Sequence, residues 1–302
     1  MANLNDLLSH INFTKEEITT VDNAMVTLIN TIKSKANENK IPKPISYFMF
    51  GSIARKTKIK PLDDVDIMYV VDSAIKQGDS ENHNLLECSI NFGPTKYEPN
   101  TTNISSLILL NDIKSAIIET YSTSEVKRNQ EVVNVYLSSY GVGFDIVPAF
   151  LITNMDYYLI PFGHGLHKWK RTNPNKGMDL FNRVNNRHNF LVRDTLKIIK
   201  YWFQKKNIVT PGSYHLECVL CYAFDNSIIT LDNLKSTLSY AFQNINFCNY
   251  LLNCPDPYRP SGNLKSNLTQ ADVDKIVAYA IEAENLLSDI QGFVNYIDED
   301  IE

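Results

Sequence analysis

Three aspartates give this sequence its clearest chemical signal. Asp64 and Asp66 stand two residues apart just before an apolar run at 67–71, and alternate residues of a strand point to the same face of a sheet. Asp145 interrupts a second apolar run, 142–147, where an unpaired carboxylate would be costly to bury. A bound cation would offset that cost. Three acids on adjacent strands therefore predict a two-metal site, with ions about 3.5–4 Å apart, that activates a hydroxyl and stabilises a leaving pyrophosphate.

A Gly-Ser pair supports this interpretation. Gly51 and Ser52 end the apolar run 45–50, which predicts a buried strand followed by a tight turn. Such a turn presents backbone N–H groups and a hydroxyl to anionic oxygens, and glycine allows close approach. A Gly-Ser turn beside two carboxylates suits a nucleoside triphosphate with its cation.

Further along the chain, basic and polar residues follow a helical pattern. Arg193, Lys197 and Lys200 lie at i, i+4 and i+7, on one face of a predicted helix. Ser213 stands at the predicted start of the next helix, where free backbone amides favour an anion. A solvated helix face remains the alternative for the first two basic residues.

The ordered set of motifs resembles the polymerase-beta-type nucleotidyltransferases. Within that superfamily it is most similar to the bacterial CD-NTases, relatives of cyclic GMP-AMP synthase and oligoadenylate synthetase. The likeness covers residues 45–265 and rests on these segments: Gly51-Ser52, Asp64-Val65-Asp66, Phe144-Asp145-Ile146-Val147-Pro148, Lys200-Tyr201-Trp202 and Ser213-Tyr214-His215-Leu216-Glu217.

The resemblance implies an activity and roles for individual residues. It implies conversion of NTPs (ATP, GTP or pyrimidine NTPs) to a cyclic di- or trinucleotide that activates a separate effector protein in anti-phage defence. Asp64, Asp66 and Asp145 would hold two Mg²⁺ ions, with Mn²⁺ able to substitute. The nucleotide would be held by these residues: Gly51, Ser52, Lys197, Lys200, Ser213 and, by stacking on a base, Tyr214.

Two other functions remain open from the sequence. One is a template-independent transferase that extends RNA or modifies a small molecule, and the other is a nucleotide-binding module without turnover. The net charge of −5 argues against an RNA acceptor and against obligate binding of duplex nucleic acid. The intact set of acids argues against a module without turnover.

The helices and strands that the sequence predicts around these residues indicate an α/β (α+β) chain of two lobes. We expect a nucleotidyltransferase lobe with a mixed sheet over residues 1–160, a helical nucleotide-binding lobe over 161–302, and the active site in a cleft between them. A capping box at Thr14 predicts the first long helix, and alternation on both sides of 138–141 predicts a β-hairpin. Residues 73–103 predict mainly loop.

The bulk composition fits a cytoplasmic protein. The 302 residues are 44% hydrophobic and 21% charged, which is typical of globular chains. We find no signal peptide and no apolar run that could span a membrane, and the five cysteines are expected to be reduced. Two local motifs could bind zinc, but packing in the core is favoured for Cys218 and Cys221, and a polar loop for His164 and His167.

Overall fold

The computed structural model of the chain describes residues 2–78, 85–90, 106–121, 125–152, 157–162, 169–258 and 262–301. The chain forms two compact units, each assembled from segments that are distant in sequence. The sheet unit comprises Thr14–Gly51 and Leu62–Asn173, and the helical unit comprises Met1–Phe13, Ser52–Pro61 and Pro174–Glu302.

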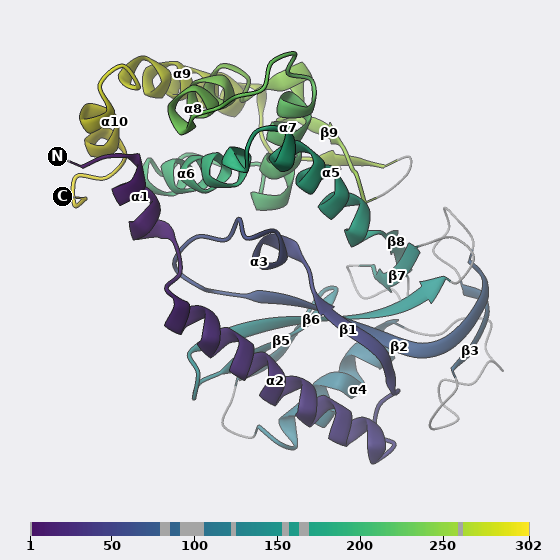
Figure 1. Cartoon of the computed structure of the whole chain (residues 1–302). Coiled ribbons are helices and arrows are strands. Elements are labelled where there is room, and N and C mark those ends of the chain that lie inside the picture. Colours follow the sequence, from purple (N-terminus) through teal and green to yellow (C-terminus); the bar gives the residue numbers. More distant parts are fainter. Residues whose placement is uncertain are drawn as a thin grey trace. The chain divides into compact units, whose positions relative to one another are not determined.

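An eight-stranded mixed sheet forms the centre of the sheet unit, within the described residues (Figure 1). Its strands are β1 (Pro44–Met49), β2 (Val65–Gly78), β3 (Leu85–Ile90), β4 (Glu125–Asn129), β5 (Val132–Leu137), β6 (Val142–Ile152), β7 (Tyr157–Pro161) and β8 (Trp169–Thr172). The order is β1-β2-β6-β5-β4, with β3 on β2, and β7 joining β6 to β8. Strands β2 and β6 run parallel and the other pairs run antiparallel. The predicted mixed sheet is therefore present.

Two helices, α2 (Lys15–Asn37) and α4 (Ser106–Ile118), pack against each other and against this sheet (Figure 1). Helix α2 begins at the predicted capping box, in which the Thr14 amide donates to the Glu17 carboxylate at 2.7 Å and the Glu17 amide donates to the Thr14 hydroxyl at 3.2 Å. One face of the sheet is fully buried at Ile67 and Ile146. Because side chains alternate along a strand, Asp66 and Asp145 belong to the opposite face.

Two expectations for this unit were wrong. Strand β1 is an edge strand rather than a buried one, and Ile45 and Tyr47 are 50% and 38% exposed. An apolar run alone does not distinguish a central strand from an edge strand. The stretch 73–103 also contains strand structure, since β2 continues to Gly78 and pairs with β3. Backbone pairing with a neighbour forms these strands where local alternation is weak.

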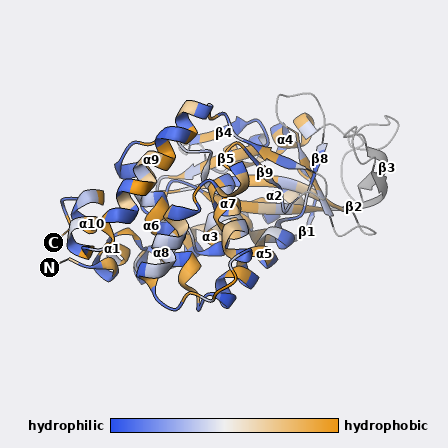
Figure 2. Cartoon of the chain, turned by 90° about the horizontal axis from the view of Figure 1, so that it is seen from above, coloured by the Kyte–Doolittle hydropathy of each residue, from blue (hydrophilic) through white to orange (hydrophobic). Residues whose placement is uncertain are grey.

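The helical unit contains eight helices in its described part, and all of them except α3 contribute to one hydrophobic core (Figures 1 and 2). They are α1 (Leu4–Ile11), α3 (Gly51–Arg55, whose first residue belongs to the sheet unit), α5 (Pro174–Arg187), α6 (Leu191–Lys205), α7 (Ser213–Asp225), α8 (Leu234–Gln243), α9 (Gln270–Leu286) and α10 (Ile290–Ile297). A two-stranded sheet of β9 (Asn253–Pro255) and β10 (Asn263–Lys265) completes the unit. Trp202 packs edge-on against Phe242, which in turn contacts Phe293.

The helical unit is interrupted where the apolar spacing of residues 231–250 alone predicts one continuous helix. Helix α8 ends at Gln243, and only a short 3₁₀ turn, η2 (Phe247–Asn249), follows. Cys248 and Asn249 have positive φ angles, which an α-helix cannot accommodate. None of the helices in the described part of the chain combines the length and apolar character that a membrane crossing requires.

Candidate active site

The parallel pairing of β2 and β6 places two of the three predicted acids side by side. Asp66 and Asp145 are register partners, on strands that lie about 4.8 Å apart in any sheet. Register partners point to the same face, and both side chains are half-buried. Asp64 lies two residues before Asp66, immediately before the start of β2. The structure thus gathers the acids at one end of two central strands.

One polar residue that the sequence analysis missed lies next to this pair. Asn134 on β5 is the register partner of Asp145, and its Nδ2 donates to Asp145 Oδ1 at 2.9 Å. It interrupts the apolar strand Val-Val-Asn-Val, as Asp145 interrupts its own strand. A polar residue in an apolar run was therefore the signal that could have found it.

Two glycines make room for the acids. A Cβ atom built on Gly51 would lie 2.0 Å from Oδ2 of Asp66, and the φ angle of Gly51 is +70°. A Cβ on Gly143 would lie 2.5 Å from the backbone oxygen of Asp63. Side chains at these two positions would displace the Asp66 carboxylate or the segment that carries Asp64. Both glycines are required by close approach.

The residues present suit a cation that is shared with a substrate. Among the described residues, no group of three His, Cys, Asp or Glu side chains is arranged to hold a metal ion alone. Mg²⁺, however, is usually bound by one or two carboxylates together with substrate phosphates and water. The pair Asp66 and Asp145 provides two hard oxygen donors of this kind on one face. This donor set fits Mg²⁺ bound to a triphosphate.

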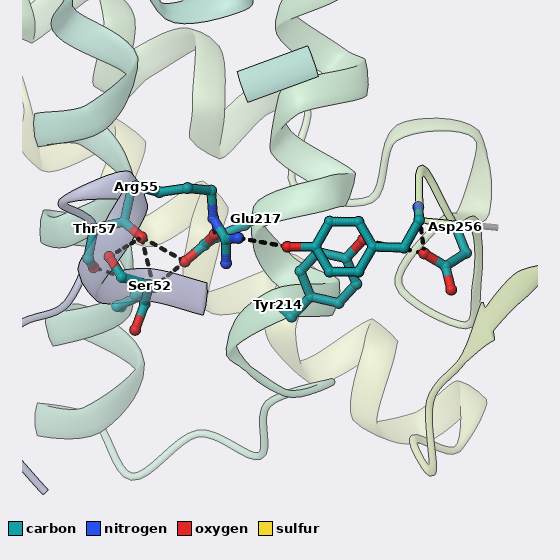
Figure 3. Close-up of polar contacts among 8 residues, drawn as sticks. Ser52, Arg55, Thr57, Tyr214, Glu217 and Asp256 are labelled. Atoms are coloured by element: carbon teal, nitrogen blue, oxygen red, sulfur yellow. Dashed lines mark hydrogen bonds and ion pairs between the residues drawn. The ribbon is translucent and has the colours of Figure 1, made fainter. Parts of the chain in front are cut away.

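Apart from Gly51, the predicted nucleotide-binding residues belong to the helical unit, where a buried carboxylate lies at the centre of a polar network (Figure 3). Glu217 on α7 accepts a hydrogen bond from Arg55 Nε at 2.5 Å, one from the Thr57 hydroxyl at 2.7 Å, and one from Lys200 Nζ. Lys200 Nζ also donates to the Thr57 carbonyl at 3.1 Å. The carbonyl of Ser52 accepts from the Thr57 amide at 2.8 Å. These contacts tie the segment Ser52–Pro61 to α6 and α7.

Burial and charge act against each other in this network. The side chains of Glu217 and Lys200 are only 3% and 9% exposed. Burial lowers the pKa of Lys200, although Glu217 opposes the shift. Burial alone would raise the pKa of Glu217, but Lys200 and Arg55 bring it below its usual value. The carboxylate therefore stays charged, facing two cations, and this leaves an excess of positive charge.

Tyr214 extends the same network toward β9. Its ring stacks on that of Tyr258, with centroids 4.4 Å apart, and its hydroxyl donates to Asp256 at 3.1 Å (Figure 3). Tyr258 in turn accepts a hydrogen bond from Arg55 at 2.7 Å. One side of the Tyr214 ring is thus occupied by another aromatic ring. Stacking of a nucleotide base on the other face of the Tyr214 ring remains a prediction.

The remaining predicted nucleotide contacts are placed as follows. Ser213 is the exposed first residue of α7, and no side chain caps the first turn of this helix. Lys197 Nζ donates to Asn12 Oδ1 at 2.6 Å, and burial lowers its pKa. The structure therefore joins Ser52, Lys200 and Tyr214 in one network but directs Lys197 to a different partner.

The two motifs considered for zinc have separate outcomes. Cys218 and Cys221 are buried free thiols among apolar side chains, as expected of cysteines that pack in a core. Burial raises the pKa of both thiols, which disfavours the thiolate that zinc needs. His164 and His167 lie outside the described residues.

The comparisons with known proteins settle the family. The family model of the Second Messenger Oligonucleotide or Dinucleotide Synthetase domain (SMODS) matches residues 1–185, well over half of the chain. The chain belongs to the SMODS family. Its members are metal-dependent nucleotidyltransferases that synthesise cyclic oligonucleotides, as the sequence motifs predicted.

Individual relatives agree with this assignment. The SMODS chain is 28% identical to a probable cyclic nucleotide synthase of Bacillus cereus (strain VD146), over 82% of this chain and 74% of the relative. It is 25% identical to the cyclic dipyrimidine nucleotide synthase CdnE of Legionella pneumophila, over 74% and 76%. Its fold matches a variant of the Vibrio cholerae di-nucleotide cyclase DncV in complex with ATP and GTP, with a TM-score of 0.74 at 12% identity, over 99% and 94%.

Proposed function

We propose that this chain converts two or three NTPs into a cyclic di- or trinucleotide, with release of pyrophosphate and with two Mg²⁺ ions as cofactors. The observation that carries the proposal is the pairing of Asp66 with Asp145 across β2 and β6, in a chain of the SMODS family. The DncV complex with ATP and GTP and the name of the CdnE relative support NTP substrates of both base classes. The product would activate a separate effector in the cytoplasm, in anti-phage defence.

We assign each predicted site residue a role in metal or nucleotide binding. Asp64, Asp66 and Asp145 would hold the Mg²⁺ ions, which supply Lewis-acid activation of the acceptor hydroxyl and of the leaving pyrophosphate. The excess positive charge around Glu217 supports binding of the anionic triphosphate near Lys200. Gly51 and Ser52 would contribute backbone amides and a hydroxyl, and Ser213 the uncapped first turn of α7. Tyr214 would stack on a base, and Lys197 would add positive charge.

The test is synthesis by the purified full chain. Incubation with the four NTPs and Mg²⁺ is expected to give a phosphatase-resistant product, and mass spectrometry would identify its bases and ring size. Replacing Asp66 or Asp145 by Asn removes a ligand charge and is expected to lower the rate by at least a hundredfold, because the two positions act as one site. EDTA is expected to have the same effect.

Asp63→Asn is the matched control. Asp63 is the exposed neighbour of Asp64, and its Oδ1 accepts from the Asp64 amide at 3.1 Å, a bond that asparagine can also accept. This variant is expected to keep most of the activity. Recovery of unreacted NTPs over several metals and pH values would contradict the proposal, as would extension of added RNA in place of a cyclic product.

A further inference from the structure

The acid-bearing face of the sheet continues past Asp145 to a residue that has no assigned role. Asn134 lies on β5 between Val133 and Val135, both 0% exposed, and is itself half-buried on the opposite face. The register places Asp66, Asp145 and Asn134 in one row across β2, β6 and β5. Burying a polar amide beside valines is unfavourable unless the amide has a partner. Its partner is the Asp145 carboxylate.

The hydrogen bond occupies one oxygen of that carboxylate and leaves the other available. Asn134 Nδ2 donates to Asp145 Oδ1 at 2.9 Å, and no described residue donates a hydrogen bond to Oδ2. A short side chain in a strand has several accessible rotamers, and a fixed donor selects among them. Asn134 therefore restricts which way the free oxygen of Asp145 is presented.

The amide is also electrically neutral. Lys127, the next residue of the row on β4, is 67% exposed and pairs with Glu125 on its own strand. A cationic side chain hydrogen-bonded to Asp145 would neutralise part of the negative charge that attracts a metal ion. The neutral amide instead fixes the orientation of the carboxylate and leaves its full negative charge. This combination suits a carboxylate that must bind a cation.

We propose that Asn134 is a positioning residue for nucleotidyl transfer, which holds Oδ1 of Asp145 so that Oδ2 is directed at the cation and the acceptor hydroxyl. The proposal rests on the proposed function for the role of Asp145, but the hydrogen bond itself can be tested without activity. Partners of this kind typically change metal affinity or activity by about 10–100-fold when they are removed.

The experiment compares three variants of the full chain. Asn134→Leu keeps the approximate shape of the side chain and removes the donor, and Asn134→Gln keeps an amide donor. Asn129→Leu makes the same change at an exposed position of the neighbouring strand β4. We expect Asn134→Leu to lower kcat by about tenfold or more with little change in KM for NTPs, Asn134→Gln to restore part of kcat, and Asn129→Leu to match the wild type.

Crystal structures of the metal-free wild type and Asn134→Leu supply the second measurement. The Asp145 side chain is expected in one rotamer in the wild type and in a different or mixed rotamer in the variant. An unchanged rotamer, or wild-type kcat in Asn134→Leu, would overturn the proposal while leaving the proposed function intact. If the wild type itself makes no product, the proposed function fails, and the rotamer comparison still decides whether Asn134 positions Asp145.

Discussion

Glu217 organises a polar network, although the sequence analysis gave it no role beyond its place in a family motif. It lies within the apolar run 216–224, and its side chain is 3% exposed with Arg55, Thr57 and Lys200 as donors. A carboxylate can be buried in such a run only if hydrogen-bonding partners offset the cost of desolvation. Two of these partners, Thr57 and Lys200, lie 160 and 17 residues away in the sequence. Its place in an apolar run does signal a buried and partnered carboxylate, but the sequence does not show which residues are the partners.

The exposed and buried carboxylates of this chain should differ sharply in their effect on stability. Replacing Glu217 by Gln keeps the shape but leaves Arg55 and Lys200 buried without a counter-charge. Removing one partner of a buried ion pair typically costs about 3–5 kcal/mol. We expect a lower free energy of unfolding of about that size, measured by urea denaturation at neutral pH.

Surface position and pH provide the controls for this prediction. Glu119→Gln removes a carboxylate that pairs with Lys35 and Lys40 at the surface, and is expected to leave stability nearly unchanged. Because the pKa of Glu217 is lowered in the folded chain, its stabilisation is present above its unfolded value, near pH 4.5, and is lost as the pH falls through the folded value. The stabilities of Glu217→Gln and the wild type should therefore converge in acid, and a constant difference would contradict the account.

At the scale of elements, local signals predicted much of the fold but not the pairing that forms the site. The capping box at Thr14 and the hairpin of β5 and β6 are both present, because caps, alternation and turns depend on residues that are neighbours in the sequence. The parallel pairing of β2 with β6 joins segments almost 80 residues apart at Asp66 and Asp145. No local pattern fixes such a register, so the sequence analysis could place the acids on adjacent strands but could not pair Asp66 with Asp145.

The same pairing depends on a close crossing at Gly143. Its substitution by Ala would place a Cβ 2.5 Å from the Asp63 carbonyl oxygen, so the segment before β2 must move. Overpacking of this kind typically costs about 1–3 kcal/mol. We expect lower thermal stability and a lower kcat, because Asp64 moves with Asp63, measured by melting and by product formation.

A second glycine, in the turn that precedes β6, separates the two effects. Gly141 has a φ of +67°, and a Cβ there has ordinary space, with Tyr136 as its nearest neighbour at 3.9 Å. Gly141→Ala should therefore lower stability through backbone strain while kcat is retained. Loss of activity in both variants to the same degree would show that the crossing at Asp63 has no special role.

At the scale of the whole molecule, the two units do not coincide with two consecutive stretches of sequence. Residues from α1 and from the segment Ser52–Pro61 belong to the helical unit together with α5 to α10. Leu7 and Ile11 of α1 are 0% and 1% exposed in its core. A boundary near residue 160 follows from the change in local pattern, which cannot show that an early segment returns to a later unit. That boundary stays a prediction, and it can be tested.

A fragment of residues 161–302 would contain the predicted helical lobe but lack two parts of the helical unit. Fully burying a leucine or isoleucine is worth about 1.5–3 kcal/mol, so losing α1 exposes a costly apolar face on α6 and α10. The fragment would also lack Arg55 and Thr57, leaving Glu217 with one of its three donors. Against a net stability of typically about 5–15 kcal/mol, these losses predict a fragment without cooperative unfolding. A chain that joins 1–13, 52–61 and 174–302 through Gly-Ser linkers restores both parts and is expected to melt cooperatively with dispersed amide resonances. Cooperative folding of 161–302 by itself would instead place the boundary where the sequence pattern changes.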